Sequence, residues 1–492
     1  MVLYVVMVAP ECAPAAKAGG LGDVVSGLSR ELELRGNAVE IILPKYASMQ
    51  YSDIWGLQPT YHDLWVPWYE GAICCTVWFG YANGRKCFFI EPHSAANFFG
   101  RDRLYGYDDD AERFAFFSKA TIEFMLRANK RPDVIHCHDW QTGLVPVLLY
   151  EQYGEVMPDQ RVCYTIHNFR HQGTSGEQVL WATRLGRPDY FLDADRLGDD
   201  FWYRGLNPMK GGVMYSNFVT TVSPSHASEG LYGDASSGLG RTLKEYQEKF
   251  RGVLNGVDYD AWNPEKDPLL PTRYSADTIE GKQKNQEALR DRFWLRKTRS
   301  PVVAYVGRLD EQKGMHLVHH ALFYTLARGG QFVLIGDAHH HDSINGHFWH
   351  LKDYLKDNQD CHLELGYHEE LAHLVYAGAD LLVVPSMFEP CGLAPLIGMR
   401  YGTVPVVRST GGMIDTVFDR DHSGRPAAER NGYVFHQTDN QAIESALSRA
   451  LRLRSDRPAE FRELVASCMR ADYSWARPGQ EYLDIYEYIR HK

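Results

Sequence analysis

The chain alternates short runs of β-branched and other apolar residues with longer amphipathic stretches, and this alternation restricts the possible folds more than any other feature. In the first half, the apolar runs lie at residues 3–8, 38–43, 134–136, 162–167 and 219–222. Strands separated by helical segments are typical of a parallel sheet with helices on both faces. The pattern therefore predicts an α/β fold built on a doubly wound sheet.

The pattern is interrupted once and then begins again, which indicates a second domain. A polar, Pro-containing stretch from Asn255 to about Thr278 has the composition of a linker. Beyond it, apolar runs at α/β spacing lie at residues 302–306, 332–335, 362–365, 381–385 and 404–407. We predict two doubly wound, Rossmann-like domains, residues 1–255 and 256–474, with a last helix in residues 475–492. The active site is expected in a central cleft between the domains.

Net charge and cysteine content limit the classes of partner and the cellular compartment that the sequence allows. The 52 Lys and Arg against 63 Asp and Glu give a formal net charge of -11, which argues against nucleic acid or an anionic membrane as the main partner. The N-terminal apolar run lacks the basic flank of a signal peptide. The nine cysteines are odd in number and form no CxxC pair, which favours reduced thiols over disulfides or a zinc site. We therefore expect a cytoplasmic protein.

A glycine-rich segment follows the first predicted strand and leads into an apolar helical stretch. It contains Glu11, Lys17, Gly19 and Gly20. Glycines at a strand-to-helix turn allow backbone N–H groups to approach a phosphate, and the helix N-terminus and the lysine add positive charge. Because the lysine precedes the glycines, the segment is neither a GxGxxG nor a Walker loop. It predicts a diphosphate site, unless the glycines serve only a tight turn.

The second domain offers two cations of its own at a strand end. Arg308 and Lys313 follow the run 302–306 and are close enough in the chain for one loop to present both to one anion. Arg can bind phosphate oxygens through two N–H groups, whereas Lys acts as a point charge. Both could instead be solvated surface residues, but their position after a strand favours an anion site.

Two further turns of the second domain carry groups suited to a nucleotide sugar. Glu389 follows the run 381–385 and can accept hydrogen bonds from sugar hydroxyls. The N–H groups of the next turn, from Cys391 through Gly392 to Leu393, can face a phosphate. Thr410 lies in a polar turn after the following predicted strand.

Polar residues also follow strands of the first domain, and they fit carbohydrate recognition. Asp139 and His167 lie at strand ends, and Trp140 offers a stacking surface for a sugar ring. His138 and Asp139 have no third ligand at a convincing spacing, so we predict no metal site. The acidic run 108–110 is interpreted as a helix N-terminus, and the histidines at 339–341 as a solvated loop.

Taken together, eight segments resemble the bacterial and plant glycogen and starch synthase family in order and separation over essentially the whole chain. They are KAGGLGD (17–23), HDW (138–140), TIHN (165–168), NGVD (255–258), GRLDEQKG (307–314), GY (366–367), PSMFEPCGL (385–393) and STGG (409–412). The resemblance implies a GT-B fold whose last helix packs back on the first domain. Met387 and the segment NPMKGGVMYSN resemble the cyanobacterial and plant soluble starch synthase branch.

The resemblance also implies an activity. It is a retaining transfer of glucose from ADP-glucose to the non-reducing 4-OH end of an α-1,4-glucan such as glycogen, starch or a maltooligosaccharide. Retaining members of this fold are thought to react by front-face substitution, in which the leaving phosphate helps to deprotonate the incoming hydroxyl. Such a reaction needs cations that neutralise the leaving diphosphate, but no metal ion, no cofactor and no side-chain nucleophile.

Individual roles follow from the same resemblance. Lys17, Arg308 and Lys313 would hold the donor diphosphate with help from the Gly19 and Gly20 backbone. Glu389 and Asp139 would contact the donor glucose, and His167 would lie near the anomeric carbon. Tyr367 would stack on adenine, and Asn255 would help to position the sugar.

One departure from the family pattern leaves two alternatives open. Where many relatives have Thr-Gln after EPCGL, this chain has Ala394 and Pro395, which removes a hydroxyl. The chain could therefore be a catalytically weak glucan-binding or granule-initiation protein, although Lys17, His167 and Glu389 are retained. The other alternative is a GT-B transferase for a UDP-sugar. Many such enzymes carry a second Glu eight residues after the first, a position that is Ile397 here.

Overall fold

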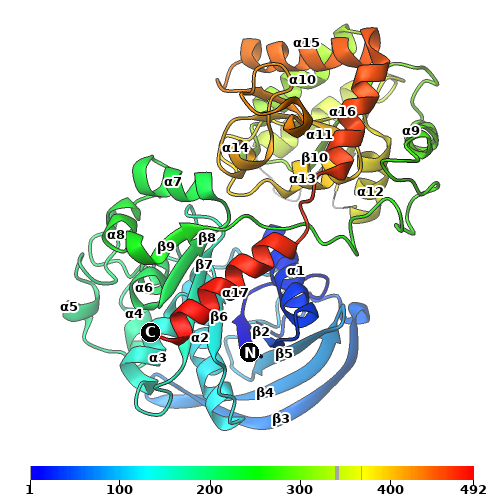
Figure 1. Cartoon of the computed structure of the whole chain (residues 1–492). Coiled ribbons are helices and arrows are strands. Elements are labelled where there is room, and N and C mark those ends of the chain that lie inside the picture. Colours follow the sequence, from blue (N-terminus) through cyan, green and yellow to red (C-terminus); the bar gives the residue numbers. More distant parts are fainter. Residues whose placement is uncertain (1, 338–342, 367) are drawn as a thin grey trace. The chain divides into compact units, whose positions relative to one another are not determined.

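The computed structural model describes residues 2–337, 343–366 and 368–492 of the chain. These residues form two compact units (Figure 1). Unit 1 comprises residues 1–256 and 475–492, and unit 2 comprises residues 257–474. Each unit has its own hydrophobic core of buried aliphatic and aromatic side chains.

Unit 1 is organised around a nine-stranded sheet with the strand order β3-β4-β5-β2-β1-β6-β7-β8-β9. All pairs from β5 to β9 in this order are parallel, whereas β3, β4 and β5 pair antiparallel. The strands are β1 (Tyr4–Val8), β2 (Ala38–Pro44), β3 (Ile54–Trp68), β4 (Gly71–Ala82), β5 (Arg85–Pro92), β6 (Val134–His138), β7 (Arg161–Ile166), β8 (Phe218–Thr221) and β9 (Phe250–Gly252).

The helices of unit 1 follow the parallel strands, as the alternation of apolar runs predicts. Their bounds are α1 (Gly20–Leu34), α2 (Asp110–Arg127), α3 (Leu144–Tyr153), α4 (Gln178–Ala182), α5 (Pro188–Phe191), α6 (Pro208–Tyr215), α7 (Pro224–Tyr232) and α8 (Gly240–Glu245). The acidic run 108–110 lies at the beginning of α2, because Asp109 is the N-cap and Asp110 the first helical residue. Its interpretation as a helix N-terminus is therefore confirmed.

The last helix, α17 (Ala476–Arg490), belongs to unit 1 although it follows unit 2 in the chain. It buries Tyr482, Ile485, Tyr486 and Ile489 against α1 and the sheet (Figure 1). The preceding Trp475 packs so closely on α1 that a side chain at Gly27 would collide with its indole. These apolar residues recur every three or four positions, so they form one face of the helix, and that face is buried.

Unit 2 contains a six-stranded parallel sheet with the order β12-β11-β10-β13-β14-β15. Its strands are β10 (Val302–Arg308), β11 (Gln331–Asp337), β12 (Cys361–Leu365), β13 (Leu381–Val384), β14 (Val404–Arg408) and β15 (Tyr433–Phe435). Its helices are α9 (Glu280–Arg292), α10 (Met315–Ala327), α11 (Ser343–Leu355), α12 (Glu369–Gly378), α13 (Leu393–Arg400), α14 (Gly412–Thr416), α15 (Asn440–Asp456) and α16 (Pro458–Arg470).

Each sheet reverses its winding at one central point. In unit 1, β1 lies between β2 and β6, and in unit 2, β10 lies between β11 and β13. Loops after neighbouring strands turn to opposite faces at such a point, which opens a crevice at the carboxyl ends of the strands. The loops after β1 and β6, and those after β10 and β13, are therefore the first places to look for a ligand site.

Candidate functional site

The loop after β1 is built around the buried carboxylate of Glu11. Its Oε2 accepts hydrogen bonds from the N–H groups of Ala18 (2.7 Å) and Gly19 (3.0 Å), and its Oε1 accepts one from the Tyr105 hydroxyl (2.7 Å). Burial raises the pKa of this carboxyl. The Gly19 N–H thus donates to Glu11, and the carboxylate fixes the shape of the loop.

The same loop ends at the N-terminus of α1. Gly19 is the N-cap and provides no side chain to cap the helix, and Gly20 is the first helical residue. The Lys17 ammonium lies in this turn and forms an ion pair with Asp23 at 2.9 Å. A helix N-terminus with an adjacent cation attracts anions. The structure thus brings Lys17 and the two glycines together, as an anion site would require.

Asp139 follows β6 on the other side of the switch point and has a constrained backbone. Its φ of 57° is unusual for a residue other than glycine. Its Oδ1 accepts a hydrogen bond of 2.6 Å from the N–H of His167, which follows β7. Desolvation raises the pKa of Asp139 to about 7. The carboxyl group is thus held beside His167 and titrates near neutral pH.

Three histidines lie against one another behind Asp139. The Nδ1 of His138 lies 3.1 Å from the Nε2 of His167, and the ring of His136 packs on that of His138. Desolvation lowers the pKa of His167 and of His136 to about 3. His167 is therefore a neutral imidazole at physiological pH, able to donate or accept a hydrogen bond without adding charge.

Trp140 and Asn255 complete the unit 1 residues that the sequence singled out. Trp140 is half-buried, with its ring edge-on to Phe114 and its six-membered ring against Gly173, where a Cβ would collide with it. Asn255 is buried at the end of unit 1, and its Oδ1 has no hydrogen-bond partner among the described residues. A buried amide oxygen without a partner is costly, so Asn255 has an acceptor to offer a ligand.

In unit 2, Lys313 and Glu389 meet across the switch point. The Lys313 Nζ lies 2.6 Å from the Glu389 Oε2, and the Ser386 hydroxyl donates to the same oxygen at 2.9 Å. Arg308 is half exposed, and its guanidinium lies 3.3 Å from the Asp310 carboxylate. The end of β10 and the loops after β10 and β13 thus place two cations and two carboxylates on one edge of the sheet.

The turn that carries Glu389 is packed backbone to backbone on the turn after β14. The Gly412 N–H donates to the carbonyl of Glu389 at 3.1 Å. A Cβ at Gly411 would lie 2.0 Å from that carbonyl oxygen, and Gly411 has a φ of 48°. Only glycine fits such a position. The neighbouring Thr410 is buried. The STGG segment thus packs against the turn that carries Glu389 and supports its backbone conformation.

The N-terminus of α13 follows directly. Gly392 is its N-cap with a φ of 84°, Cys391 is buried, and Leu393 begins the helix. Ala394 and Pro395 occupy its first turn, where proline costs no hydrogen bond because first-turn N–H groups have no partner within the helix. Because proline has no backbone N–H, Pro395 also removes one N–H group that could have faced an anion.

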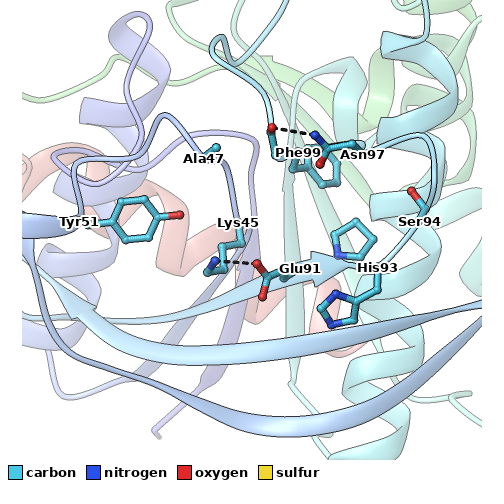
Figure 2. A pocket seen from close by; sticks show the side chains of 10 residues that line it. Lys45, Ala47, Tyr51, Glu91, His93, Ser94, Asn97 and Phe99 are labelled. Carbon is cyan, nitrogen blue, oxygen red and sulfur yellow. Dashed lines mark hydrogen bonds and ion pairs between the residues drawn. The ribbon is translucent and has the colours of Figure 1, made fainter.

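A polar pocket of about 310 Å³ opens in unit 1 between the segments that follow β2 and β5 (Figure 2). Lys45 and Glu91 form an ion pair of 2.8 Å in it, and Tyr51, His93 and Asn97 line its sides. Because β1 and β2 are parallel, this pocket lies at the same edge of the sheet as Glu11.

Sequence reasoning missed two contributors to these sites. Tyr105, which holds Glu11, lies in no motif, and the only signal that could have found it is its place before the acidic run 108–110. Ser386 lies within the segment PSMFEPCGL, but nothing in the sequence singled out its hydroxyl as a partner of Glu389. Two predictions fall outside the described residues: the adenine contact of Tyr367 and the loop at residues 339–341.

Three findings concern other kinds of site. The described residues contain no group of three or more His, Cys, Asp or Glu side chains arranged to hold a metal ion. Within the same residues, no helix is long and apolar enough to cross a membrane. All nine cysteines lie in the described part of the chain and carry thiols rather than disulfides.

Comparison with known proteins defines the class. Residues 4–245 match the family model for the starch synthase catalytic domain, and residues 287–464 match that for glycosyl transferases group 1. Glycogen synthase 1 of Synechococcus sp. (strain JA-3-3Ab) is 61% identical over 492 residues, covering 100% of both chains. Glycogen synthase 2 of Methylococcus capsulatus is 60% identical over 486 residues, which is 99% of this chain and 100% of that one.

Comparison with solved structures points to the same family. The catalytic domain of starch synthase IV from Arabidopsis thaliana, bound to ADP and acarbose, matches with a TM-score of 0.98 and 40% identity over 100% of both chains. Sucrose-phosphate synthase from Thermosynechococcus elongatus matches with a TM-score of 0.62 at 18% identity over 99% of both chains. The second likeness concerns the fold alone.

The two parallel-sheet units and these structural neighbours define a glycosyltransferase of the GT-B class. The chain belongs to the glycogen and starch synthase family and is an enzyme of that family. The resemblance drawn from the eight sequence segments, including that to cyanobacterial enzymes, is thereby confirmed.

Proposed function

We propose that this enzyme transfers glucose from ADP-glucose to the non-reducing 4-OH end of an α-1,4-glucan, with retention of configuration and without a metal ion. The observation that carries the proposal is the position of the polar residues at both switch points, after β1, β6, β10 and β13. The relative bound to ADP and acarbose, a nucleoside diphosphate and an α-glucan mimic, supports the same pair of substrates.

In this proposal, Arg308 and Lys313 neutralise the leaving diphosphate, with Lys17 and the N-terminus of α1 as further support. The Lys313 ammonium is already held by Glu389 at 2.6 Å, so it is oriented before a donor arrives. Fixed cations lower the energy of a transition state in which negative charge grows on the leaving phosphate. Because protein cations supply this charge, turnover should not require a divalent metal.

The remaining residues orient the sugars. Glu389 and Asp139 accept hydrogen bonds from hydroxyls of the donor glucose, and the neutral His167 lies near the anomeric carbon. Trp140 contributes an aromatic face to a sugar, and the unpartnered Oδ1 of Asn255 accepts a hydroxyl hydrogen. Tyr367 is proposed to stack on adenine. Cys391, Gly392, Leu393 and Thr410 shape the turns around the diphosphate.

The bond changes balance without a protein nucleophile. The bond between the anomeric carbon and the diphosphate oxygen breaks, and the acceptor 4-OH oxygen bonds to the same carbon from the same face. The acceptor proton passes to the departing phosphate oxygen, which leaves as ADP. The side chains thus position both substrates and stabilise charge. We place the activity in the cytoplasm because all nine cysteines are thiols.

ADP release from ADP-glucose with glycogen as acceptor tests this proposal. The same assay is run with UDP-glucose and with EDTA present. We expect EDTA-resistant turnover that prefers ADP-glucose. A preference for UDP-glucose would assign another donor, and loss of activity in EDTA would overturn the metal independence. Folded protein that binds glycogen but releases no ADP would make it a glucan-binding protein, with Ala394 and Pro395 as the first positions to restore.

A further inference from the structure

Three consecutive aromatic residues are exposed on the surface of unit 1, in the segment between α5 and α6. The exposed fraction is 81% for Phe201, 50% for Trp202 and 88% for Tyr203. Single exposed aromatics are ordinary, but adjacent ones on a protein surface usually mark a binding site. We call Phe201, Trp202 and Tyr203 the aromatic platform.

The platform lies on a loop whose backbone is closed by its own hydrogen bonds. The Asp199 N–H donates to the Gly205 carbonyl at 2.7 Å, and the Gly205 N–H donates to the Trp202 carbonyl at 2.7 Å. The Asp199 Oδ1 accepts from the N–H groups of Phe201 and Trp202, both at 2.9 Å. The aromatic side chains therefore project from an ordered turn.

Buried polar groups support this turn from below. The Lys210 Nζ is buried and donates to the carbonyls of Ala194 (2.6 Å) and Gly198 (2.8 Å) and to the Asp200 carboxylate (3.0 Å). Burying an ammonium group is costly unless it is fully hydrogen-bonded. The buried Lys210 ammonium thus holds the base of a loop whose tip is apolar and exposed.

The loop that carries the platform is bonded to a loop of the proposed active site. The Asn207 Nδ2 donates to the Asp199 Oδ2 at 2.9 Å and to the Gln172 Oε1 at 2.6 Å. Gln172 lies on the loop after β7 that also carries His167, and the adjacent Gly173 packs on Trp140. Hydrogen bonds thus link the platform loop to the loop that carries His167, and packing of Gly173 links that loop to Trp140.

We propose that the aromatic platform binds α-1,4-glucan at glucose units outside the reacting end of the acceptor chain. Aromatic rings stack on the apolar faces of sugar rings, and their flanking polar groups can bond the hydroxyls. Here Arg204, paired with Asp189 at 2.9 Å and Glu177 at 3.3 Å, and Asp200 flank the rings. Because acidic and basic groups both flank the rings, the surface has no single sign of charge that would favour a charged ligand over an uncharged polymer. The inference rests on the proposed function, because it names a second contact for the same acceptor.

The test compares the double variant Trp202→Ser/Tyr203→Ser with the wild type on a long and a short acceptor. We expect at least a fivefold loss of glycogen affinity in affinity electrophoresis and a similar rise in the KM for glycogen. The kcat/KM for maltotriose should change less than twofold, because a trisaccharide is too short to span the reacting end and the platform. Trp202→Phe/Tyr203→Phe should restore glycogen affinity.

Tyr354→Ser is the matched control, because Tyr354 is 78% exposed on α11 of unit 2. It should leave glycogen affinity unchanged, and thermal unfolding should show that the double variant is folded. Unchanged glycogen affinity in the double variant overturns the platform proposal while ADP release still supports the proposed function. A change from dimer to monomer in light scattering, without loss of glycogen affinity, would overturn it in favour of a second copy as the occupant.

Discussion

Unit 1 and unit 2 place their site residues at equivalent points of two parallel sheets, yet they surround those residues differently. In unit 1, desolvation lowers the pKa of His167 to about 3 and raises that of Asp139 to about 7. In unit 2, Arg308 is half exposed, and Lys313 and Glu389 form a direct ion pair. Unit 1 therefore suppresses charge around His167 and Asp139, whereas unit 2 keeps a charged pair at the equivalent strand ends.

This difference corresponds to two tasks of the proposed reaction, although each unit also contributes to the other task, through Lys17 at the diphosphate and Glu389 at the donor glucose. A diphosphate carries several negative charges and needs permanent cations, which remain well solvated until the ligand binds. A glucose unit is uncharged, and its hydroxyls are best recognised by neutral or singly charged hydrogen-bonding groups in a less polar setting. The same fold thus serves two ligand chemistries because the surroundings of each strand end differ. Four experiments would break or sharpen this comparison.

The largest effect is expected for Lys313→Ala in unit 2. The substitution removes a cation at the leaving diphosphate and leaves Glu389 without its partner at 2.6 Å. We expect kcat to fall roughly ten- to a hundredfold, about 1.4–2.7 kcal/mol. Steady-state kinetics with ADP-glucose measure this change. Lys297→Ala, which removes an exposed ion pair with Asp291, is the control, and equal kinetics for both variants would remove Lys313 from the site.

The neutral histidines of unit 1 predict that the protein loses stability in acid. The folded-state pKa of His136 is about 3, against about 6.5 in an unfolded chain. Between these values the unfolded state binds more protons, so the stabilisation present above pH 6.5 is lost as the pH falls. At pH 5 the loss is about 2 kcal/mol for this histidine.

Urea unfolding at pH 7 and pH 5 measures this loss, with His136→Asn as the comparison. The variant should show a smaller difference between the two pH values than the wild type, whatever its absolute stability. His136 also accepts or donates a hydrogen bond with the Tyr486 hydroxyl of α17 at 2.7 Å. An identical pH dependence in the variant and the wild type would show that His136 is not the group responsible.

Asp139 predicts a pH dependence of activity. With a pKa of about 7, it becomes protonated below neutral pH and then loses one acceptor for a sugar hydroxyl. The kcat/KM for the donor should therefore decline as the pH falls from 8 to 6. Asp139→Asn can still accept the His167 N–H, but it should be about tenfold slower at pH 8 and lack this decline. A decline that persists in the variant would have another origin.

The smallest effect is expected at the N-terminus of α13. Ala394→Thr introduces a hydroxyl in the first turn of the helix. We expect the KM for ADP-glucose to fall about threefold, on the order of 0.6 kcal/mol. Ala394→Val, which adds similar bulk without the hydroxyl, is the matched control. An equal fall in both variants would assign the gain to packing.

The sequence predicts β1, β2, β6, β7 and β8 of unit 1 and β10 to β14 of unit 2, because fully buried parallel strands appear as continuous apolar runs. It does not reveal β3, β4 and β5, which form an antiparallel extension in which many side chains face solvent. Long, half-exposed strands such as Ile54–Trp68 mix Trp, Gln, Pro and His, so their pattern is weak. The short β15 also escapes notice because three residues carry too little periodicity.

For the candidate site, the rule that ligands lie after parallel strands was sufficient to select Asp139, His167 and Glu389. What the sequence could not provide is how these residues are held. The contacts of Tyr105 with Glu11 and of Lys313 with Glu389 join positions 94 and 76 residues apart. Such pairs depend on tertiary packing. The bond from the Gly19 N–H to Glu11 likewise depends on how the loop folds back on itself.

The return of α17 to unit 1 has a consequence for synthesis on the ribosome. Because residues 475–492 complete the core of unit 1, that core lacks Trp475, Tyr482 and Tyr486 while all of unit 2 is being translated. The core of unit 1 therefore stays incomplete until residues 475–492 have been translated. A nascent chain that stops before residue 475 should expose the α1 surface to chaperones, and errors in translating residues 475–492 should destabilise unit 1 rather than unit 2.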